Sequence, residues 1–168
     1  MIKKIILLSS VLILFSTNTF SQIMVYNKNL KDSSDIICNI LNTKVYQATS
    51  NKKEKILCNI VGNKIYKVNL NDEKNILFII KNGKVYRGNS TSEYDIMYTI
   101  KDGVMYKKDT KEIIATKRGN IVYDKKSKLE SDILFRFNAD VNTEEFIAVW
   151  YVHLMKILKS QARYYRQY

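Results

Sequence analysis

The chain has 168 residues and a net charge of +12, and this length fits a single domain. One histidine and two cysteines supply no His/Cys/Asp cluster with the spacing of a metal site, so the sequence gives no sign of a metal centre. The basic balance favours anionic partners, although abundant Lys, Asn, Ile and Tyr without any Pro also fit a compositional bias of the source genome.

The first segment, residues 1–21, has the layout of a secretory signal peptide. Two lysines precede an apolar run over Ile5–Phe15, and a small polar stretch ends with Thr19 and Ser21. The apolar run is short for a membrane span, and no cysteine follows it closely as a lipoprotein anchor requires. We therefore expect cleavage after Ser21 and a location in the periplasm, in the cell envelope or outside the cell. An uncleaved N-terminal anchor is the alternative.

The next 120 residues, 22–141, repeat one phrase of about 20 residues, best seen at Ile76–Tyr86. It reads as a strand, a two-residue turn at Asn82-Gly83 and a second strand, because Asn-Gly between apolar runs favours a tight β-hairpin. The corresponding turns are expected at Asn42-Thr43, Gly62-Asn63, Asp102-Gly103 and Gly119-Asn120. The tyrosines that end each phrase are Tyr26, Tyr46, Tyr66, Tyr86, Tyr106 and Tyr123.

The ends of this array are two half-phrases, a lone second strand at Ile23–Tyr26 and a lone first strand at Ile133–Phe137. Their pairing would close a ring and remove both exposed edges. The sequence therefore predicts an all-β fold, a closed antiparallel barrel of about twelve strands. A hairpin solenoid of the choline-binding or MORN type is the rival architecture, and its Trp-Tyr and Gly-x-Gly signatures are missing here.

Alternation along each first strand predicts which side chains point inward. It places Ile36, Cys38, Ile40 and their equivalents in the interior, and the repeated Tyr with Ile37, Leu57, Leu77, Met97, Ile114 and Leu134 on the outer face. Each Tyr is expected to shield a neighbouring aliphatic side chain. Cys38 and Cys58 are expected to be small core residues, since two strand spacings, roughly 9–10 Å, exceed the reach of a disulfide. A disulfide is the minority interpretation for an exported protein.

A barrel of this width needs filling, and residues 142–158 supply the candidate. Asn142 and Glu145 form a capping pair, and the run Phe146–Val152 is apolar on every side, which predicts a buried helix. The remaining segment, residues 159–168, is basic and aromatic, suited to an anionic interface or to a frayed end.

The repeated phrase at Asp95–Lys107, followed by Thr143–Tyr151, resembles the bacterial β-flower family over nearly the whole chain after the signal segment. The resemblance implies a shallow, pseudo-symmetric barrel with an apolar central channel around a C-terminal helix, similar to Tubby-like C-terminal domains. It implies no established activity; membrane or lipid association is only suggested by the Tubby likeness. Pseudo-fourfold members are known, whereas this chain contains six pseudo-repeats.

No catalytic constellation or cofactor motif is visible, and the single histidine, His153, lies in the most apolar segment, so we expect a non-enzymatic protein. The candidate binding residues are the repeated Tyr, the cations that follow or precede them, and the basic tail. They are Tyr46, Tyr66, Tyr86, Tyr106, Lys64, Lys67, Lys84, Arg87, Lys107, Arg163 and Arg166. A basic ring of such cations, with Lys81 and Lys101, is one hypothesis; a solvated rim that blocks aggregation is the other.

Two functions follow. The chain is either a peripheral binding module for anionic lipid or an acidic surface polymer, or a scaffold for another envelope protein without a small ligand. Export makes nucleic acid an unlikely partner.

Overall fold

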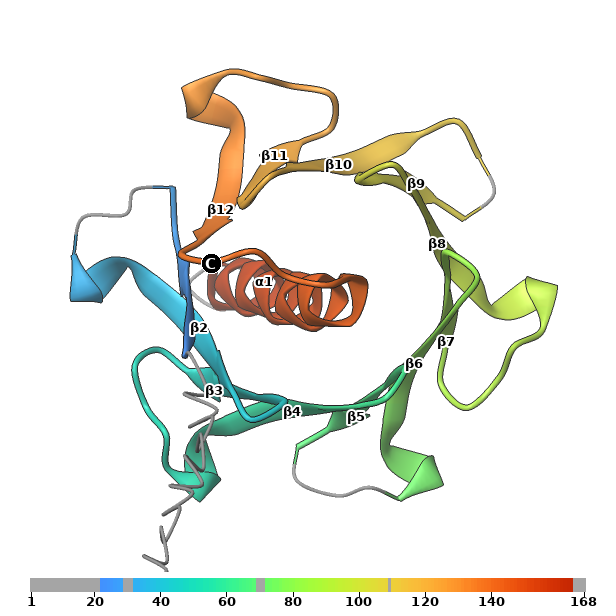
Figure 1. Cartoon of the computed structure of the whole chain (residues 1–168), viewed down its shortest axis with the longest axis horizontal. Coiled ribbons are helices and arrows are strands. Elements are labelled where there is room, and N and C mark those ends of the chain that lie inside the picture. The colour runs from blue at the N-terminus through green and yellow to red at the C-terminus, as the bar shows by residue number, and fades with distance from the viewer. Residues whose placement is uncertain (1–21, 29–31, 69–71, 109, 165–168) are drawn as a thin grey trace, which may run out of the picture.

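The repeated phrase folds into twelve antiparallel strands that close around one α-helix (Figure 1). The computed structural model describes residues 22–28, 32–68, 72–108 and 110–164, with the side chains of 163 and 164 left out. The predicted signal peptide and Arg166 lie outside the described residues. The strands are β1 (Ile23–Tyr26), β2 (Ile36–Leu41), β3 (Lys44–Gln47), β4 (Ile56–Val61), β5 (Lys64–Lys67), β6 (Ile76–Lys81), β7 (Lys84–Arg87), β8 (Ile96–Lys101), β9 (Val104–Lys107), β10 (Ile113–Arg118), β11 (Ile121–Asp124) and β12 (Ile133–Phe137), and the helix is α1 (Thr143–Tyr164).

Each repeat unit is a six-residue strand, a two-residue turn and a four-residue strand. The turn residues Asn82 and Gly83 both have positive φ, as the predicted hairpin turn requires. The carbonyl oxygen of Gly83 accepts a hydrogen bond of 2.6 Å from Ile100 N in the next unit, and the other turns repeat this link. All turns therefore lie at one end of the barrel, the turn end, and the connections between units lie at the other, the loop end.

The barrel closes where the two half-phrases meet. Val25 of β1 lies opposite Phe137 of β12, and Met24 O accepts a hydrogen bond of 3.0 Å from Asn138 N. This pairing leaves neither strand with an open edge. The predicted closed barrel of twelve strands is confirmed.

The seams between units carry a β-bulge that the sequence analysis did not foresee. Val45 lies opposite Cys58 and Tyr46 opposite Ile56, so that Leu57 is an extra residue with no partner. A bulge turns two consecutive side chains to the same side of the sheet. The same register shift occurs at all six seams between units: β1–β2, β3–β4, β5–β6, β7–β8, β9–β10 and β11–β12.

Because of the bulges, the first two positions of the long strands lie on the opposite faces from those predicted. Ile76 and Ile96 lie on the outer face, in a cluster with Tyr66, Tyr86 and Ile79. The extra residues pack against the interior core instead, because strict alternation fails at the bulge. They are Ile37, Leu57, Leu77, Met97, Ile114 and Leu134. The shielding of aliphatic side chains by Tyr66 and Tyr86 is confirmed.

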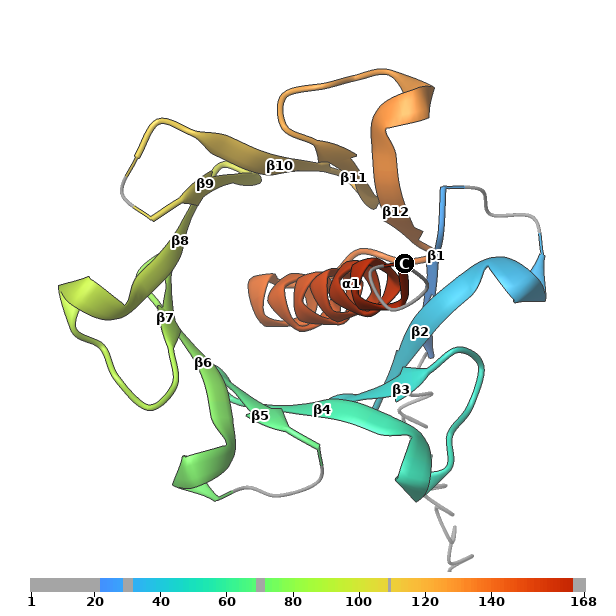
Figure 2. The ribbon, with the colours of Figure 1, turned by 180° about the vertical axis from the view of Figure 1, so that it is seen from behind.

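The helix α1 crosses the interior obliquely and lies off-centre (Figure 2). Its backbone comes close to β2, β4 and β5. Side-chain size explains this off-centre position. The inward slot at the third position of β2 and β4 holds Cys38 and Cys58, whereas the same slot of β6 and β8 holds Phe78 and Tyr98. Small side chains on one wall let the helix approach, and aromatic side chains fill the space on the opposite wall.

Candidate functional site

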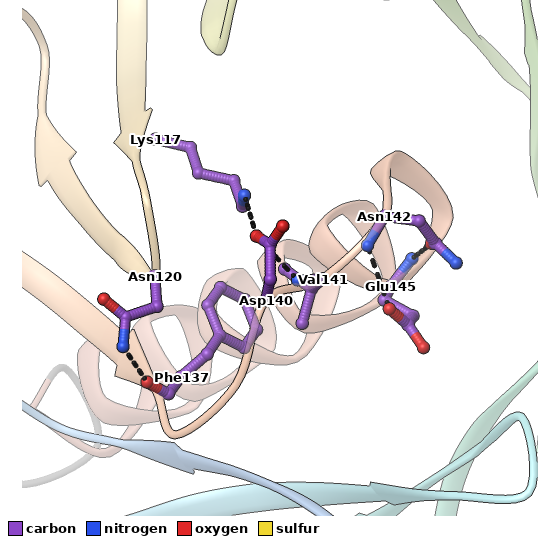
Figure 3. A network of polar contacts seen from close by, with 7 residues as sticks. All are labelled: Lys117, Asn120, Phe137, Asp140, Val141, Asn142 and Glu145. Carbon is purple, nitrogen blue, oxygen red and sulfur yellow. Dashed lines mark hydrogen bonds and ion pairs between the residues drawn. The ribbon is translucent and has the colours of Figure 1, made fainter.

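The helix α1 occupies the barrel, and we call it the plug. It begins at the turn end, where a polar network fixes its first turn (Figure 3). Asn142 Oδ1 accepts a hydrogen bond of 2.8 Å from Glu145 N, and Asn142 N donates one of 2.9 Å to Glu145 Oε2, so the predicted capping pair is confirmed. Lys117 Nζ lies 3.0 Å from Asp140 Oδ1. These contacts tie the segment before the helix to β10 and hold the helix at a fixed depth.

The first half of α1 fills the barrel. Phe146, Ile147, Ala148 and Val149 are almost completely buried. Trp150 meets Tyr98 edge-on, with ring centroids 6.5 Å apart. The predicted central helix is therefore correct for this half, and aromatic contacts of this kind add to the apolar burial.

The second half of α1 leaves the barrel at the loop end. Burial raises the pKa of Cys38, and Lys156 lies close enough to oppose this rise, which places this turn of the helix near the first inward residues of β2, at the loop end. Met155, Ile157 and Leu158 are exposed, at 36%, 39% and 57%. With about 100° per residue, Met155, Ile157 and Leu158 lie within an arc of about 160°, and Lys156 and Lys159 lie in the remaining arc, Lys159 next to Met155. The emerging helix is amphipathic.

The opening through which α1 emerges is lined by the last residue of each of the short strands β3, β5, β7, β9 and β11, and we call it the mouth. Lys67 lies opposite Cys58, and Arg87 opposite Phe78. Residues directly opposite each other share a face, so these side chains belong to the inner face, yet they are exposed because the barrel ends there. The described lining residues of the mouth are Gln47, Lys67, Arg87, Lys107 and Asp124.

The structure divides the candidate cations between the two ends of the barrel. Lys64 and Lys84 begin their strands at the turn end, on the outer face. Lys67, Arg87 and Lys107 end the same series of strands at the mouth. Lys107 also forms an exposed ion pair of 3.2 Å with Glu112.

The candidate tyrosines do not join these cations. Tyr46, Tyr66 and Tyr86 are buried on the outer face, where they have a packing role, and Tyr106 is half-buried there. Arg163 lies in α1, but its side chain is not among those described. Of the candidate residues whose side chains the structure describes, the mouth therefore brings together Lys67, Arg87 and Lys107.

Sequence reasoning missed the residues that complete this surface. The exposed apolar side chains of α1 and the cations Lys156 and Lys159 were read as the continuation of a buried helix and its tail. A signal was present: around His153 the run that is apolar on every side gives way to a two-sided pattern typical of interfacial helices.

Burial suppresses the ionisation of the titratable groups inside the barrel. Burial raises the pKa of the Cys58 thiol to about 12 and also raises the pKa of Cys38, so neither free thiol is a nucleophile at neutral pH. Burial, with a smaller effect of Lys156, lowers the pKa of His153.

Among the described residues, no group of three or more His, Cys, Asp or Glu side chains is placed to hold a metal ion. Within that same part of the chain, no helix is both long and apolar enough to cross a membrane.

Fold and mouth together define a class of protein, the closed barrel of repeated β-hairpins with a helical plug. A family model described as 6-fold beta flower protein matches residues 25–150. The chain belongs to this family, and the resemblance drawn from its sequence is confirmed. No match was found among curated proteins or among solved structures.

Proposed function

We propose that the protein is an exported, non-enzymatic module that docks its mouth on an anionic membrane surface. The observation that carries the proposal is the meeting of two features at one end of the barrel. The amphipathic second half of α1 emerges there with exposed Met155, Ile157 and Leu158, and the cations Lys67, Arg87 and Lys107 line the opening beside it.

An anionic lipid surface complements both features. Apolar side chains of an interfacial helix enter the boundary between headgroups and acyl chains, and the cations on its other side stay with the headgroups. Each Lys or Arg close to an anionic surface contributes about 1 kcal/mol to binding. The net charge of the whole chain is +12, of which Lys3 and Lys4 in the predicted signal peptide contribute two, and the remaining charge adds long-range attraction that salt screens over roughly 10 Å at 0.1 M.

The test is co-sedimentation of residues 22–168 with vesicles of neutral lipid and of mixed neutral and acidic lipid, at low and high salt. This chain contains all described strands and α1. We expect binding to acidic vesicles that weakens strongly at high salt. No binding to acidic vesicles would overturn the proposal and favour the scaffold with a protein partner.

Charge removal at the two ends of the barrel provides a matched comparison. The double variant Lys67→Gln/Arg87→Gln at the mouth should weaken binding at least about ten-fold, since two surface cations contribute about 2 kcal/mol. Lys64→Gln/Lys81→Gln removes the same charge at the turn end and should change binding less than about two-fold. Equal effects of the two pairs would mean that net charge alone, and not the mouth, governs binding.

The helix is tested by Ile157→Ser/Leu158→Ser, which leaves every charge in place. We expect weaker binding at both salt concentrations, because both side chains are exposed in the free protein and would enter the lipid boundary. Unchanged binding would restrict the proposal to the cations of the mouth.

A further inference from the structure

The inner face of β8 is a part of the barrel wall that the plug leaves accessible. The third and fifth residues of each long strand point inward. In β2, β4, β6 and β12 both residues are buried, and in β10 only Lys117, which carries the ion pair with Asp140, is half-buried. In β8 both inward residues, Tyr98 and Ile100, are half-buried. Space that no protein atom fills therefore lies against β8.

The off-centre position of the plug explains this exposure. In the closed ring of twelve strands, β8 lies six strands from β2, on the opposite wall (Figure 1). The backbone of α1 comes close to β2, and the plug reaches β8 through a long side chain, since Trp150 meets the Tyr98 ring edge-on. The indole Nε1–H of Trp150 is buried without a hydrogen-bond acceptor among the described residues, so no protein group occupies the acceptor's position.

The accessible surface is narrow and apolar. Val85 of β7 lies opposite Tyr98, Met105 of β9 lies opposite Ile100, and both are completely buried. The accessible surface is therefore confined to β8, between two strands that are roughly 9–10 Å apart. We call Tyr98 and Ile100, with the extra residue Met97 next to the mouth, the β8 strip. Its side chains are apolar apart from one hydroxyl, which suits a single alkyl chain.

Two cations lie at the mouth end of the β8 strip. Arg87 ends β7 and Lys107 ends β9, and these two strands flank β8. Lys107 lies directly opposite Tyr98, so its side chain belongs to the same inner face. Both cations are exposed, and the ion pair between Lys107 and Glu112 is weak because both partners face solvent. A carboxylate at this position would lie between a guanidinium and an ammonium group.

We infer that the β8 strip binds a fatty acid as a single extended chain. Its carboxylate lies between Arg87 and Lys107 at the mouth, and its alkyl chain runs along the strip beside Trp150. Charge complementarity selects this ligand, because the apolar strip accommodates one chain and the two cations accommodate one carboxylate. A diacyl lipid has a second chain, for which a surface confined to one strand leaves no room. The inference goes beyond membrane docking and does not rest on it, since the ligand is a dissolved molecule.

Fluorescence tests the inference, since Trp150 is the single tryptophan of the chain and lies beside the strip. The probe is undecanoate with a bromine atom at the end of its chain, because bromine quenches tryptophan only at short range. It is added to residues 22–168 at pH 8 without vesicles. We expect saturable quenching at micromolar concentration that unlabelled undecanoate reverses. The matching bromo-alcohol, which has no carboxylate, should bind at least about ten-fold more weakly.

The outcome of this assay is independent of membrane docking. No quenching, or equal affinity for the bromo-alcohol, would overturn the inference and leave the vesicle result untouched. Conversely, a protein that ignores acidic vesicles can still bind the dissolved fatty acid.

Two pairs of charge variants locate the carboxylate. Arg87→Gln/Lys107→Gln should weaken undecanoate binding at least about ten-fold, because both partners of the carboxylate are removed. Lys64→Gln/Lys81→Gln removes the same charge at the turn end and should change binding less than about two-fold. Equal effects of the two pairs would contradict a carboxylate held at the mouth.

Ile100→Phe tests the path of the chain inside the barrel without altering charge. The larger ring fills the inner end of the β8 strip, so the bromine probe should bind at least about five-fold more weakly. The thermal unfolding midpoint shows whether the barrel of this variant is intact. Unchanged quenching in the folded variant would contradict the inference, and the quenching of the parent protein decides the question without any variant.

Discussion

The ammonium nitrogen of Lys117, on an inward position of β10, lies 3.0 Å from a carboxylate oxygen of Asp140 in the segment that leads into α1. The hydrogen bond from Lys117, with a second from Val141 N, lowers the pKa of Asp140. A carboxyl group whose pKa is lowered by folding stabilises the folded state above its unfolded pKa, about 3.9. This contribution is lost as the pH falls through the lowered pKa.

We therefore predict that Asp140→Asn lowers the urea midpoint of unfolding at pH 7. At the lowest pH at which both proteins remain folded, the variant and the parent should converge, since Asp140 is then protonated. Fluorescence of the single tryptophan, Trp150 in the plug, reports the transition. Asp124→Asn, an exposed carboxylate at the mouth, is the control. A constant difference between variant and parent at all pH values would contradict the ion-pair account.

We predict that substitution by Ala lowers the free energy of unfolding by different amounts at two glycines with positive φ. A Cβ atom at Gly83 would lie 2.8 Å from Ile100 O, whereas one at Gly88 would meet nothing within 4 Å. Gly88→Ala should therefore cost only the conformational penalty, about 1 kcal/mol. Gly83→Ala should cost about 2 kcal/mol or more, because the overlap also disturbs the hydrogen bond to the next unit. Urea unfolding measures both, and equal costs would contradict the overlap argument.

We predict that the buried thiols of Cys38 and Cys58 react slowly with alkylating reagents in the folded barrel. Since burial raises the pKa of Cys58 to about 12, the thiolate fraction at pH 8 is very small, and α1 covers the wall that carries both cysteines. Alkylation by a thiol reagent should be negligible in the native protein and complete in urea. The same measurement on acidic vesicles tests the plug: unchanged protection means that α1 stays inside, and rapid labelling means that it withdraws.

His153 predicts a pH effect on stability. It packs against Phe135 and Trp150, with ring centroids 5.3 and 5.7 Å away, and Lys156 is the charged group that acts on it. Because folding lowers the pKa of His153, the unfolded chain binds a proton more readily, and stability should fall as the pH drops below about 6.5.

The check is the urea midpoint between pH 7.5 and pH 5 for the parent and for His153→Phe. The chain contains one histidine, so the slope in this range should nearly vanish in the variant. A slope that persists in His153→Phe would assign the effect to another group.

Much of the site could not be predicted from the sequence, because its residues come from strands and a helix that are far apart in the chain. Lys67 and Arg87 were recognised as candidates. Their separation from Lys64 and Lys84 follows from the position of the two pairs at opposite ends of their strands, and so at opposite ends of the barrel. Their place beside the emerging helix depends on where a 22-residue helix leaves the barrel.

The sequence alone determined the repeat, the hairpin turns, the closure of the ring and the helical plug. These follow from local rules, since Asn-Gly sets a turn and unpaired half-phrases must pair. Only the tertiary structure decided the inner and outer faces at the seams, because the bulge at Leu57 and its equivalents arises from pairing between units. It also decided the off-centre position of α1, which results from packing Cys38 and Cys58 on one wall against Phe78 and Tyr98 on the other.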